Sequence, residues 1–297
     1  MNIYQNIEVY VREYDSKLLT SIFSASKGNA VFLSSLGEFK FLMKFIKLPA
    51  GIFHNKSITP SKIQYKFTKK LKKNGFLITS IDEEHGLSFN SYSDFGKLRF
   101  SEEMVKLSEY IFCWGNNDWL WLSKKYNKYK NKFILSGSPR VDLWKNKFCK
   151  SKKRKYEKKY LLFSSNFTIN NHQHSWELVK KLKNLQYHER DINYINRYLL
   201  LRGYQYNLLV ELLKAFKYIS NQFKYLDVIV RPHPIEDLNA WTEYLKDYKN
   251  FKVIREGPIT DWIHDAEAII HNGCTSSIEG IIAGKPVITY DPFDDPN

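Results

Sequence analysis

Short apolar runs alternate with longer amphipathic segments along the whole chain. In the first half, β-rich runs are followed by helical patterns, which is typical of a parallel sheet with covering helices. The strands that we expect there are 7–11, 30–35, 76–81, 110–115 and 132–137. The helices that we expect are 15–28, 38–47, 61–74, 101–108 and 117–126. These elements predict one Rossmann-like domain over residues 1–145.

The segment 145–159 interrupts this rhythm, because it holds nine basic residues and one acid and has no helical apolar periodicity. We interpret 146–159 as an interdomain linker. A solvated helix end or loop inside one domain is the alternative, and a patch that faces phosphate or a membrane is compatible with the linker role.

The same rhythm restarts after the basic segment and predicts a second Rossmann-like domain over residues 160–297. Its expected strands are 160–166, 226–234, 251–256, 266–273 and 286–292. Its expected helices are 176–223, 237–247, 260–264 and one that begins near 276. The fold class is therefore α/β, with two parallel-sheet layers in series.

Composition supports a globular protein of two domains, since the 297 residues are 43% hydrophobic and 16% aromatic. No apolar run reaches the roughly 18 residues of a membrane-spanning helix, and the N-terminus lacks a signal-peptide pattern. Cys113, Cys149 and Cys274 are too few and too scattered for a disulfide framework or a zinc site. We therefore expect a cytoplasmic protein without a metal.

The chain carries a formal charge of +15, from 46 basic and 31 acidic residues. A field of that sign favours nucleic acid, anionic lipid or phosphorylated small molecules. A compositional bias toward lysine explains part of the excess equally well. No zinc-finger spacing, helix-turn-helix pattern or aromatic RNA-binding signature accompanies it, so nucleic acid is not an expected partner.

Polar residues follow the expected strands of the second domain, at the edge where open parallel sheets bind ligands. Ser165, at the end of the expected strand 160–166, can donate to phosphate, although ordinary turn chemistry also explains it. In Arg231-Pro232-His233-Pro234 the prolines hold His233 on a rigid extended segment, and Arg231 can pair with a diphosphate. The alternative is that the prolines only end the strand.

The stretch HNGCTSSIEG, residues 271–280, passes from an apolar run through a turn at Asn272 into a helix. Unpaired backbone N–H groups and the hydroxyls of Thr275, Ser276 and Ser277 would form an anion site there. Ser276 to Glu279 also matches a capping box, in which the Glu279 carboxylate accepts from the cap residue's own N–H. The two interpretations are compatible, and the spacing does not choose between them.

Together, 231–234, 271–280 and 284–287 resemble the nucleotide-binding domain of the bacterial surface carbohydrate biosynthesis proteins, which are similar to glycosyltransferases of the GT-B fold. Softer matches extend the resemblance over nearly the whole chain; they are 14–19, 82–84, 114–115 and 137–142. The resemblance implies two Rossmann-like domains that face an interdomain cleft. GT-B proteins usually continue beyond the strand matched by 286–292, so we expect a shortened second domain.

The resemblance also implies roles for residues of the second domain. His233 and Pro234 match a His-Pro pair near the nucleotide phosphate or base. The hydroxyls that hold the phosphate fall on Thr275, Ser276 and Ser277. A carboxylate one turn later takes the ribose hydroxyls, and here it is Glu279.

In the first domain, the resemblance implies that an acidic-acidic-Gly segment supplies the catalytic carboxylate, as in bacterial sialyltransferase-like enzymes. Here the segment reads Asp82-Glu83-Glu84-His85-Gly86, and the interposed histidine leaves open which carboxylate is the base. Each of the three acids can also be structural, paired with a lysine or capping a helix. Further candidates for the cleft are Asp15, Ser16, Lys17, Lys56 and Arg140; Asp15 is alternatively a helix N-cap.

These expectations converge on a metal-independent glycosyltransferase of bacterial surface polysaccharide biosynthesis. A carboxylate would deprotonate the acceptor hydroxyl, and a cationic, donor-rich pocket would stabilise the departing phosphate. The expected co-substrate is a nucleotide-activated sugar, with a CMP-linked acidic sugar as first choice, and no cofactor is expected.

The expected partners are a glycan or lipid-linked acceptor and an anionic membrane, at the inner face of the cell membrane. Three alternative functions stay open. Two are enzymes of the same architecture, a CDP-polyol phosphotransferase and a sugar epimerase. The third is a non-catalytic, membrane-associated scaffold of the pathway.

Overall fold

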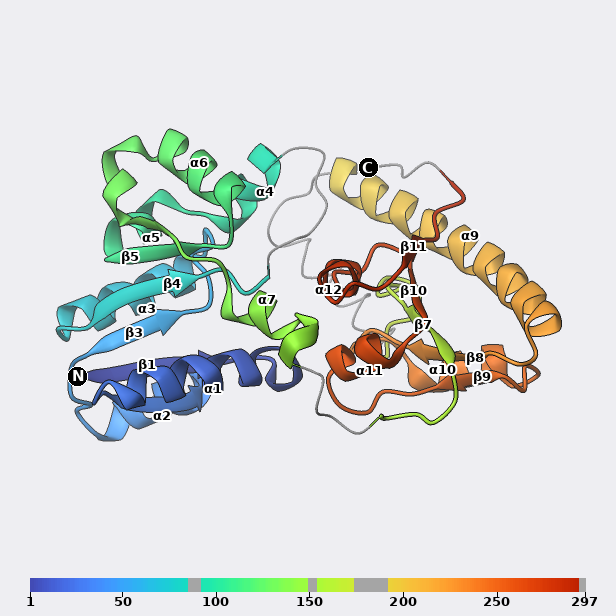
Figure 1. Ribbon diagram of the computed structural model, residues 1–297. Helices are drawn as coiled ribbons and strands as arrows, with labels where there is room; N and C mark the ends of the chain where they lie inside the picture. The colour runs from blue at the N-terminus through green and yellow to red at the C-terminus, as the bar shows by residue number, and fades with distance from the viewer. Residues whose placement is uncertain (85–91, 149–153, 174–191, 294–297) are drawn as a thin grey trace. The chain divides into compact units, whose positions relative to one another are not determined.

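The computed structural model describes residues 1–84, 92–148, 154–173 and 192–293 (Figure 1). The chain divides into two compact units, Met1–Leu143 and Trp144–Asn297. Each unit is a parallel sheet with helices on both faces, which confirms the predicted two-domain α/β fold of Rossmann-like type.

The described residues of the first unit form a six-stranded parallel sheet in the order β2-β1-β3-β4-β5-β6. The strands are β1 (Asn2–Ile7), β2 (Ala30–Ser35), β3 (Ile52–Asn55), β4 (Leu77–Ile81), β5 (Tyr110–Cys113) and β6 (Phe133–Leu135). The helices are α1 (Tyr10–Ser26), α2 (Leu36–Phe45), α3 (Lys62–Lys73), α4 (Tyr92–Arg99), α5 (Glu102–Leu107), α6 (Asn116–Lys125) and α7 (Pro139–Leu143), with a 3-10 turn η1 (Asn127–Lys132). The strand order reverses between β1 and β3.

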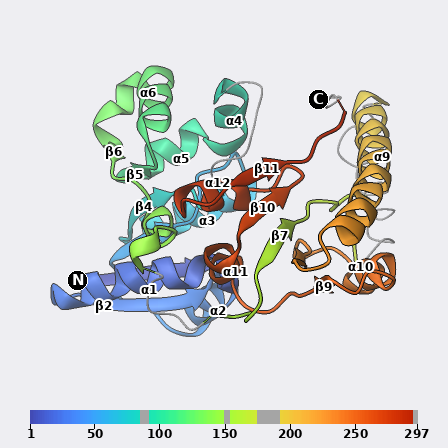
Figure 2. The ribbon, with the colours of Figure 1, turned by 45° about the vertical axis from the view of Figure 1, so that its right-hand side comes forward.

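The two faces of the first sheet differ in chemistry. Helices α2 and α3 pack on one face around Tyr4, Phe39 and Leu71, in an apolar core. Helix α1 lies on the opposite face (Figures 1 and 2), as right-handed crossovers require for a chain that passes from β1 to β2 and then back to β3. The buried residues of α1 are all polar: Glu13, Ser16, Lys17 and Ser21.

The described residues of the second unit form a five-stranded parallel sheet in the order β11-β10-β7-β8-β9. The strands are β7 (Tyr160–Ser164), β8 (Asp227–Arg231), β9 (Phe251–Val253), β10 (Ala268–His271) and β11 (Val287–Thr289). The helices are α9 (Ile192–Gln222), α10 (Leu238–Leu245), α11 (Ile259–Asp265) and α12 (Ser276–Ile282), preceded by a 3-10 turn η2 (Asn146–Phe148). The strand order reverses between β7 and β10.

Apolar side chains cover both faces of the second sheet. On one face, Phe216 of α9 and Trp241 of α10 pack in one cluster with Phe163 of β7. Trp262 and Ile269 lie in the core that α11 and α12 form on the other face. In the part of the chain that the structure describes, none of the helices combines the length and apolarity that crossing a bilayer requires.

The described part of the predicted linker attaches to the second unit. The Lys155 backbone N–H donates to the Asp265 carboxylate at 3.0 Å, and the Tyr156 hydroxyl donates to Asp227 at 2.5 Å. Residues 149–153, which include Cys149, lie outside the described residues. So do 176–191 of the expected helix, His85 and Gly86 of the acidic segment, and the last residues, 294–297.

One predicted strand of the first unit was wrong, and one strand that forms was not predicted. The strand expected at 7–11 is not formed, because β1 runs from Asn2 to Ile7 and α1 begins at Tyr10. The apolar pattern does not indicate β1, because Gln5 and Asn6 put polar side chains at buried strand positions. The strand β3 was missed for a similar reason, because His54 and Asn55 interrupt its apolar pattern.

Candidate functional site

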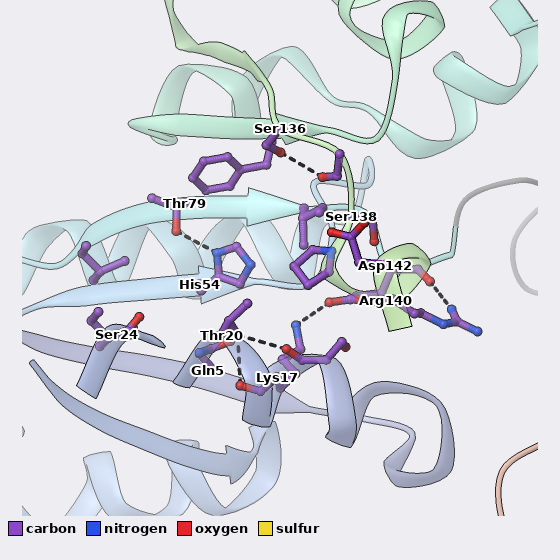
Figure 3. A pocket seen from close by; sticks show the side chains of 18 residues that line it. Gln5, Lys17, Thr20, Ser24, His54, Thr79, Ser136, Ser138, Arg140 and Asp142 are labelled. Atoms are coloured by element: carbon purple, nitrogen blue, oxygen red, sulfur yellow. Dashed lines mark hydrogen bonds and ion pairs between the residues drawn. The ribbon is translucent and has the colours of Figure 1, made fainter. Parts of the chain in front are cut away.

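A cavity of about 390 Å³ lies in the first unit between the sheet, α1 and the segment 136–142 (Figure 3). Its apolar wall comes from the centre of the sheet, with Ile52, Ile81 and Phe112. The opposite wall is polar and comes from α1, where the Thr20 hydroxyl donates to the Gln5 side chain at 3.1 Å. The cavity therefore joins an apolar surface to a row of hydrogen-bonding groups.

Three predicted residues from distant segments meet at one end of this cavity. Lys17 of α1 lies 2.5 Å from Oε1 of Glu83, which follows β4, and the two side chains are 2% and 7% exposed. Arg140 of α7 donates to the backbone oxygen of Glu83 at 2.9 Å. Among the residues that the structure describes, no donor contacts Oε2 of Glu83. This oxygen is therefore available to accept a hydrogen bond or a proton from a ligand in the cavity.

His54 lies on the floor of the same cavity and was not predicted from the sequence. Its Nδ1 is 2.8 Å from the Thr79 hydroxyl. Burial, and then the charge of Lys17, lower the pKa of His54 to about 3. The imidazole is therefore neutral at neutral pH, so it can exchange hydrogen bonds with a ligand but supplies no positive charge.

The other two predicted carboxylates form ion pairs with arginine side chains. Asp82 accepts two hydrogen bonds from Arg99, at 2.9 and 2.7 Å. Glu84 accepts from Arg12 at 3.0 Å and from Arg99 at 3.1 Å, and Lys56 lies 3.9 Å away. Burial opposes the ionised form of Glu84, but these cations prevail and its pKa is lowered. Glu83 is therefore better placed than Asp82 or Glu84 to act as a base.

A second hollow, of about 530 Å³, lies where the strand order of the first sheet reverses. The ends of β1, β2 and β3 line it with Asn6, Ser35 and Asn55, and Lys56 reaches it from the turn after β3. Asn6 is 3% exposed, and its Oδ1 has no hydrogen-bond partner among the described residues. Because buried polar atoms are normally paired, the side chain of Asn6 indicates a ligand-facing position.

In the second unit, the reversal of strand order brings the ends of β7 and β10 together. The Ser276 hydroxyl donates to the Ser164 hydroxyl at 2.8 Å. The Asn166 backbone N–H donates to the Asn272 side chain at 2.8 Å, and the Asn166 amide donates to the Gly273 carbonyl at 2.9 Å. The structure therefore gathers the predicted Asn272 and Ser276 at the point where open α/β sheets bind ligands.

The turn after β10 is held by the ring of His271. Its Nδ1 accepts from the backbone N–H of Gly273 at 3.1 Å and of Cys274 at 3.4 Å. Its Nε2 lies 3.0 Å from the Thr289 hydroxyl, so the proton is assigned to Nε2. Burial lowers the pKa of His271, which favours the neutral ring that this arrangement needs.

The predicted capping box at the start of α12 was wrong. The N-cap is Thr275, and no side chain caps the helix. Glu279 turns away from the helix start and accepts a hydrogen bond from the Thr260 hydroxyl, because it is buried between α11 and α12. The Ser277 hydroxyl donates to the Cys274 carbonyl at 2.8 Å. The N–H groups of this turn are therefore not taken by the carboxylate that the motif suggested.

Arg231 and His233 have different surroundings at the end of β8. Arg231 is buried over the Trp262 ring and donates to the carbonyls of Glu256 and Gly257, both at 2.7 Å. Burial lowers the pKa of Arg231 to about 10, so the guanidinium remains charged at neutral pH. His233 is partly exposed, and its Nδ1 lies 3.4 Å from the Ile235 N–H. Pro234 beside it is exposed.

Two further predicted residues take part in local contacts. The Ser165 hydroxyl donates to the buried Glu236, which also accepts from the Trp241 indole at 2.6 Å. Asp15 is exposed inside α1, whose N-cap is Val9, so the N-cap alternative for Asp15 was wrong. The hydroxyl of Ser16, which lines the cavity of the first unit, donates to the Glu13 carbonyl at 2.9 Å.

No family model matches the sequence, and no curated protein matches it either. Solved structures are similar in fold. MnaA from S. aureus, determined with UDP, is 13% identical with a TM-score of 0.59, and the match covers 96% of this chain and 78% of MnaA. The UDP-GlcNAc 2-epimerase from Methanocaldococcus jannaschii, in complex with UDP-GlcNAc and UDP, is 12% identical with a TM-score of 0.54, covering 97% and 82%.

The wall teichoic acid polymerase TagF is 10% identical with a TM-score of 0.51, and the match covers 97% of this chain and 69% of that chain. These comparisons agree with the sheet topology of the two units. The chain has a two-domain α/β fold of the GT-B type.

Proposed function

We propose that this chain is an enzyme that binds a nucleotide-activated sugar and transfers the sugar to an acceptor in bacterial surface polysaccharide biosynthesis. The observation that carries the proposal is the polar cluster of Ser164, Asn166, Asn272 and Ser276, which joins the ends of β7 and β10. This is the position at which open α/β sheets bind ligands. The similar MnaA and M. jannaschii structures contain UDP, which supports a nucleotide as the ligand.

In this proposal the phosphate of the donor lies at the turn between β10 and α12. The Thr275 side chain has no hydrogen-bond partner among the described residues and is partly exposed, so it is available to a ligand. Among the described residues the backbone N–H groups of Thr275 and Ser276 have no acceptor, so they add two donors for the developing negative charge. The exposed Pro234 and the neighbouring His233 are assigned to the nucleotide as the resemblance implies. The resemblance also assigns Glu279 to the ribose, and this role requires its carboxylate to exchange the Thr260 hydroxyl for the ligand.

The first unit supplies the acceptor side and the base. Oε2 of Glu83 takes the proton of the acceptor hydroxyl, while Lys17 holds Oε1 in an ion pair. The acceptor oxygen forms a bond to the anomeric carbon of the donor. The bond from that carbon to the phosphate oxygen breaks, and its electron pair leaves with the nucleotide.

Calorimetry with CMP, CDP and UDP tests the nucleotide site, and Thr275→Asp is the most informative variant. A carboxylate near the first turn of α12 is favourable for the helix dipole but repels phosphate. We expect the wild-type protein to bind one of these nucleotides, and Thr275→Asp to lose that binding while its unfolding midpoint is unchanged or higher. Thr275→Ser keeps the hydroxyl and serves as the matched control. Equal binding by Thr275→Asp and the wild type would place the nucleotide elsewhere.

A sugar epimerase is the second candidate, since the M. jannaschii enzyme of similar fold is a UDP-GlcNAc 2-epimerase. A buried carboxylate beside a neutral His54 also suits proton abstraction from a sugar carbon. Product analysis with labelled donors separates the candidates. A transferase moves the labelled sugar to the acceptor, an epimerase changes the sugar without an acceptor, and a CDP-polyol phosphotransferase moves a labelled polyol phosphate to the acceptor.

A further inference from the structure

Helix α2 and its C-cap residue, Ile46, expose four large apolar side chains that the core of the first unit does not use. Phe39 points into the core, whereas Phe41 and Phe45 are 59% and 70% exposed, with ring centroids 4.7 Å apart. Leu42 and Ile46 flank this pair and are also exposed. We call these four exposed residues the apolar ridge. An exposed cluster of this kind marks an interaction surface more often than a single exposed residue does.

Helix α3 lies beside α2 on the same face of the sheet. Phe67 of α3 packs edge-on against Phe39 at 6.4 Å, and the Lys40 ammonium lies 4.7 Å from the Phe67 ring. Both helices bury their inner sides against the same apolar cluster. Their outer sides therefore face away from the sheet in the same direction.

The outer side of α3 is a row of lysines. Thr68 and Leu71 are its buried residues, and helical spacing puts five exposed lysines on the opposite side. We call them the lysine row; they are Lys62, Lys66, Lys69, Lys70 and Lys73. None of the five forms an ion pair with another described residue.

Few acids lie near this surface. Residues 36–75 contain ten lysines and one carboxylate, Glu38, and of these lysines Lys56 and Lys72 pair with glutamates of other segments. Glu38 is engaged in the capping box of α2, where it exchanges hydrogen bonds with Ser35. A solvated helix face usually mixes both signs of charge, whereas this one leaves an unneutralised cationic surface next to exposed aromatic rings.

We propose that the apolar ridge and the lysine row together dock the first unit onto an anionic lipid bilayer. Aromatic and aliphatic side chains enter the boundary between headgroups and acyl chains, and lysines beside them pair with lipid phosphates. This surface is distinct from the basic segment 146–159, which the sequence had suggested for membrane contact. The inference goes beyond the proposed enzymatic function and does not depend on it.

Lipid fits the apolar ridge better than nucleic acid does. A single-stranded polynucleotide would need open aromatic faces on which bases stack. Phe41 and Phe45 instead pack against each other, and their neighbours Leu42 and Ile46 are aliphatic. Aliphatic side chains gain from an acyl environment but offer a base neither stacking nor hydrogen bonds.

Vesicle co-sedimentation of the full chain tests the docking surface. The probes are vesicles of mixed phosphatidylglycerol and phosphatidylcholine, with pure phosphatidylcholine as the neutral reference. We expect binding to the anionic vesicles that weakens with salt. Phe41→Ser/Phe45→Ser and Lys66→Glu/Lys70→Glu should each weaken binding by about tenfold or more.

Two control variants match these changes at other exposed positions. Leu120→Ser removes an exposed apolar side chain of α6, and Lys158→Glu/Lys159→Glu makes the same charge reversal in the basic segment. Both should bind vesicles like the wild type. Circular dichroism and nucleotide calorimetry of every variant separate a loss of docking from a loss of fold or of the nucleotide site.

Four results would overturn the proposal. The first is that the wild type shows no preference for anionic vesicles. The second is that Phe41→Ser/Phe45→Ser binds them as the wild type does. The third is that Lys158→Glu/Lys159→Glu loses as much binding as Lys66→Glu/Lys70→Glu. The fourth is tighter binding to a single-stranded RNA than to the vesicles, which would assign the surface to nucleic acid.

Discussion

Replacing Lys17 by methionine tests the buried ion pair on which the proposed base depends. Methionine keeps an unbranched, flexible side chain but removes the charge. Lys17 Nζ lies 2.5 Å from Glu83 Oε1, and neither side chain is appreciably exposed. Arg140 donates to the backbone oxygen of Glu83 and not to its carboxylate. The variant therefore leaves a buried carboxylate without its cation.

We expect Lys17→Met to lower the free energy of unfolding of the first unit by about 3–5 kcal/mol, the cost of removing one partner of a buried pair. Glu13 adds to this loss. Burial, and then the charge of Glu83, raise the pKa of Glu13, and Lys17 counteracts them. Without Lys17 the two carboxylates face each other with less compensation.

The deficit of Lys17→Met depends on pH. Its removal raises the pKa of Glu13 further above the unfolded value of 4.5. A carboxyl group whose pKa is raised by folding stabilises the protein below its unfolded pKa, and this contribution is lost as pH rises through the folded pKa. The deficit should therefore be smallest in acid and grow toward neutral pH.

Urea unfolding from acidic to neutral pH measures this loss, and hydrogen exchange of the amides in β1 and β4 assigns it to the first unit. Lys17→Met/Glu83→Gln should regain most of the stability, because it removes both charges. Lys72→Met is the matched control: Lys72 pairs with Glu109 at the surface, and such pairs contribute about 0–1 kcal/mol. The reasoning is refuted if Lys17→Met costs no more than Lys72→Met, or if the double variant is no more stable than Lys17→Met.

Three further predictions concern packing and buried polar groups. A Cβ on Gly280 would lie 2.3 Å from Ile269 Cδ1, so Gly280→Ala should cost about 1–3 kcal/mol in urea unfolding, whereas Gly203→Ala meets open space and should add about 0.5–1 kcal/mol. Glu236→Gln should lose about 1–3 kcal/mol, because an amide N–H₂ would face donors that now share the carboxylate. The pKa of His54 is lowered from 6.5 to about 3, so between these values the unfolded state binds a proton that the folded state does not. The free energy of unfolding of the wild type should therefore fall by up to about 1.4 kcal/mol per pH unit as pH drops from 6.5 to about 3, and His54→Gln should lack this dependence.

Most of the fold could be predicted because the apolar pattern and the core agree. The strand β2 covers the predicted residues 30–35, and β8 forms inside the predicted 226–234, where its residues are all buried. The predictions failed at β1 and β3, where Gln5 and His54 occupy strand positions. Both residues line the cavity of the first unit. The pattern was therefore broken by the site itself.

The candidate site was predictable only in part, because local motifs do not specify tertiary partners. Lys17, Glu83 and Arg140 were named separately, but their meeting depends on the positions of α1 and α7. Arg99 was missed, since nothing near it in the sequence points to Asp82 as a partner. The prediction of a capping box at Glu279 was wrong because the Glu279 carboxylate accepts from Thr260 of α11 instead of from the start of its own helix.

Helix α1 shows how the first unit separates stability from chemistry. Its buried residues, such as Ser16 and Lys17, are polar, whereas Ile22 and Phe23 on the same helix are 59% and 65% exposed. Hydrophobic burial alone would place Ile22 and Phe23 against the sheet and the polar side of the helix in solvent. The polar side is retained inside because the ion pair to Glu83 and hydrogen bonds to the sheet satisfy it. Since α2 and α3 supply the apolar packing on the opposite face, the α1 face is free to hold the polar groups to which we assign substrate binding and proton abstraction in the proposed function.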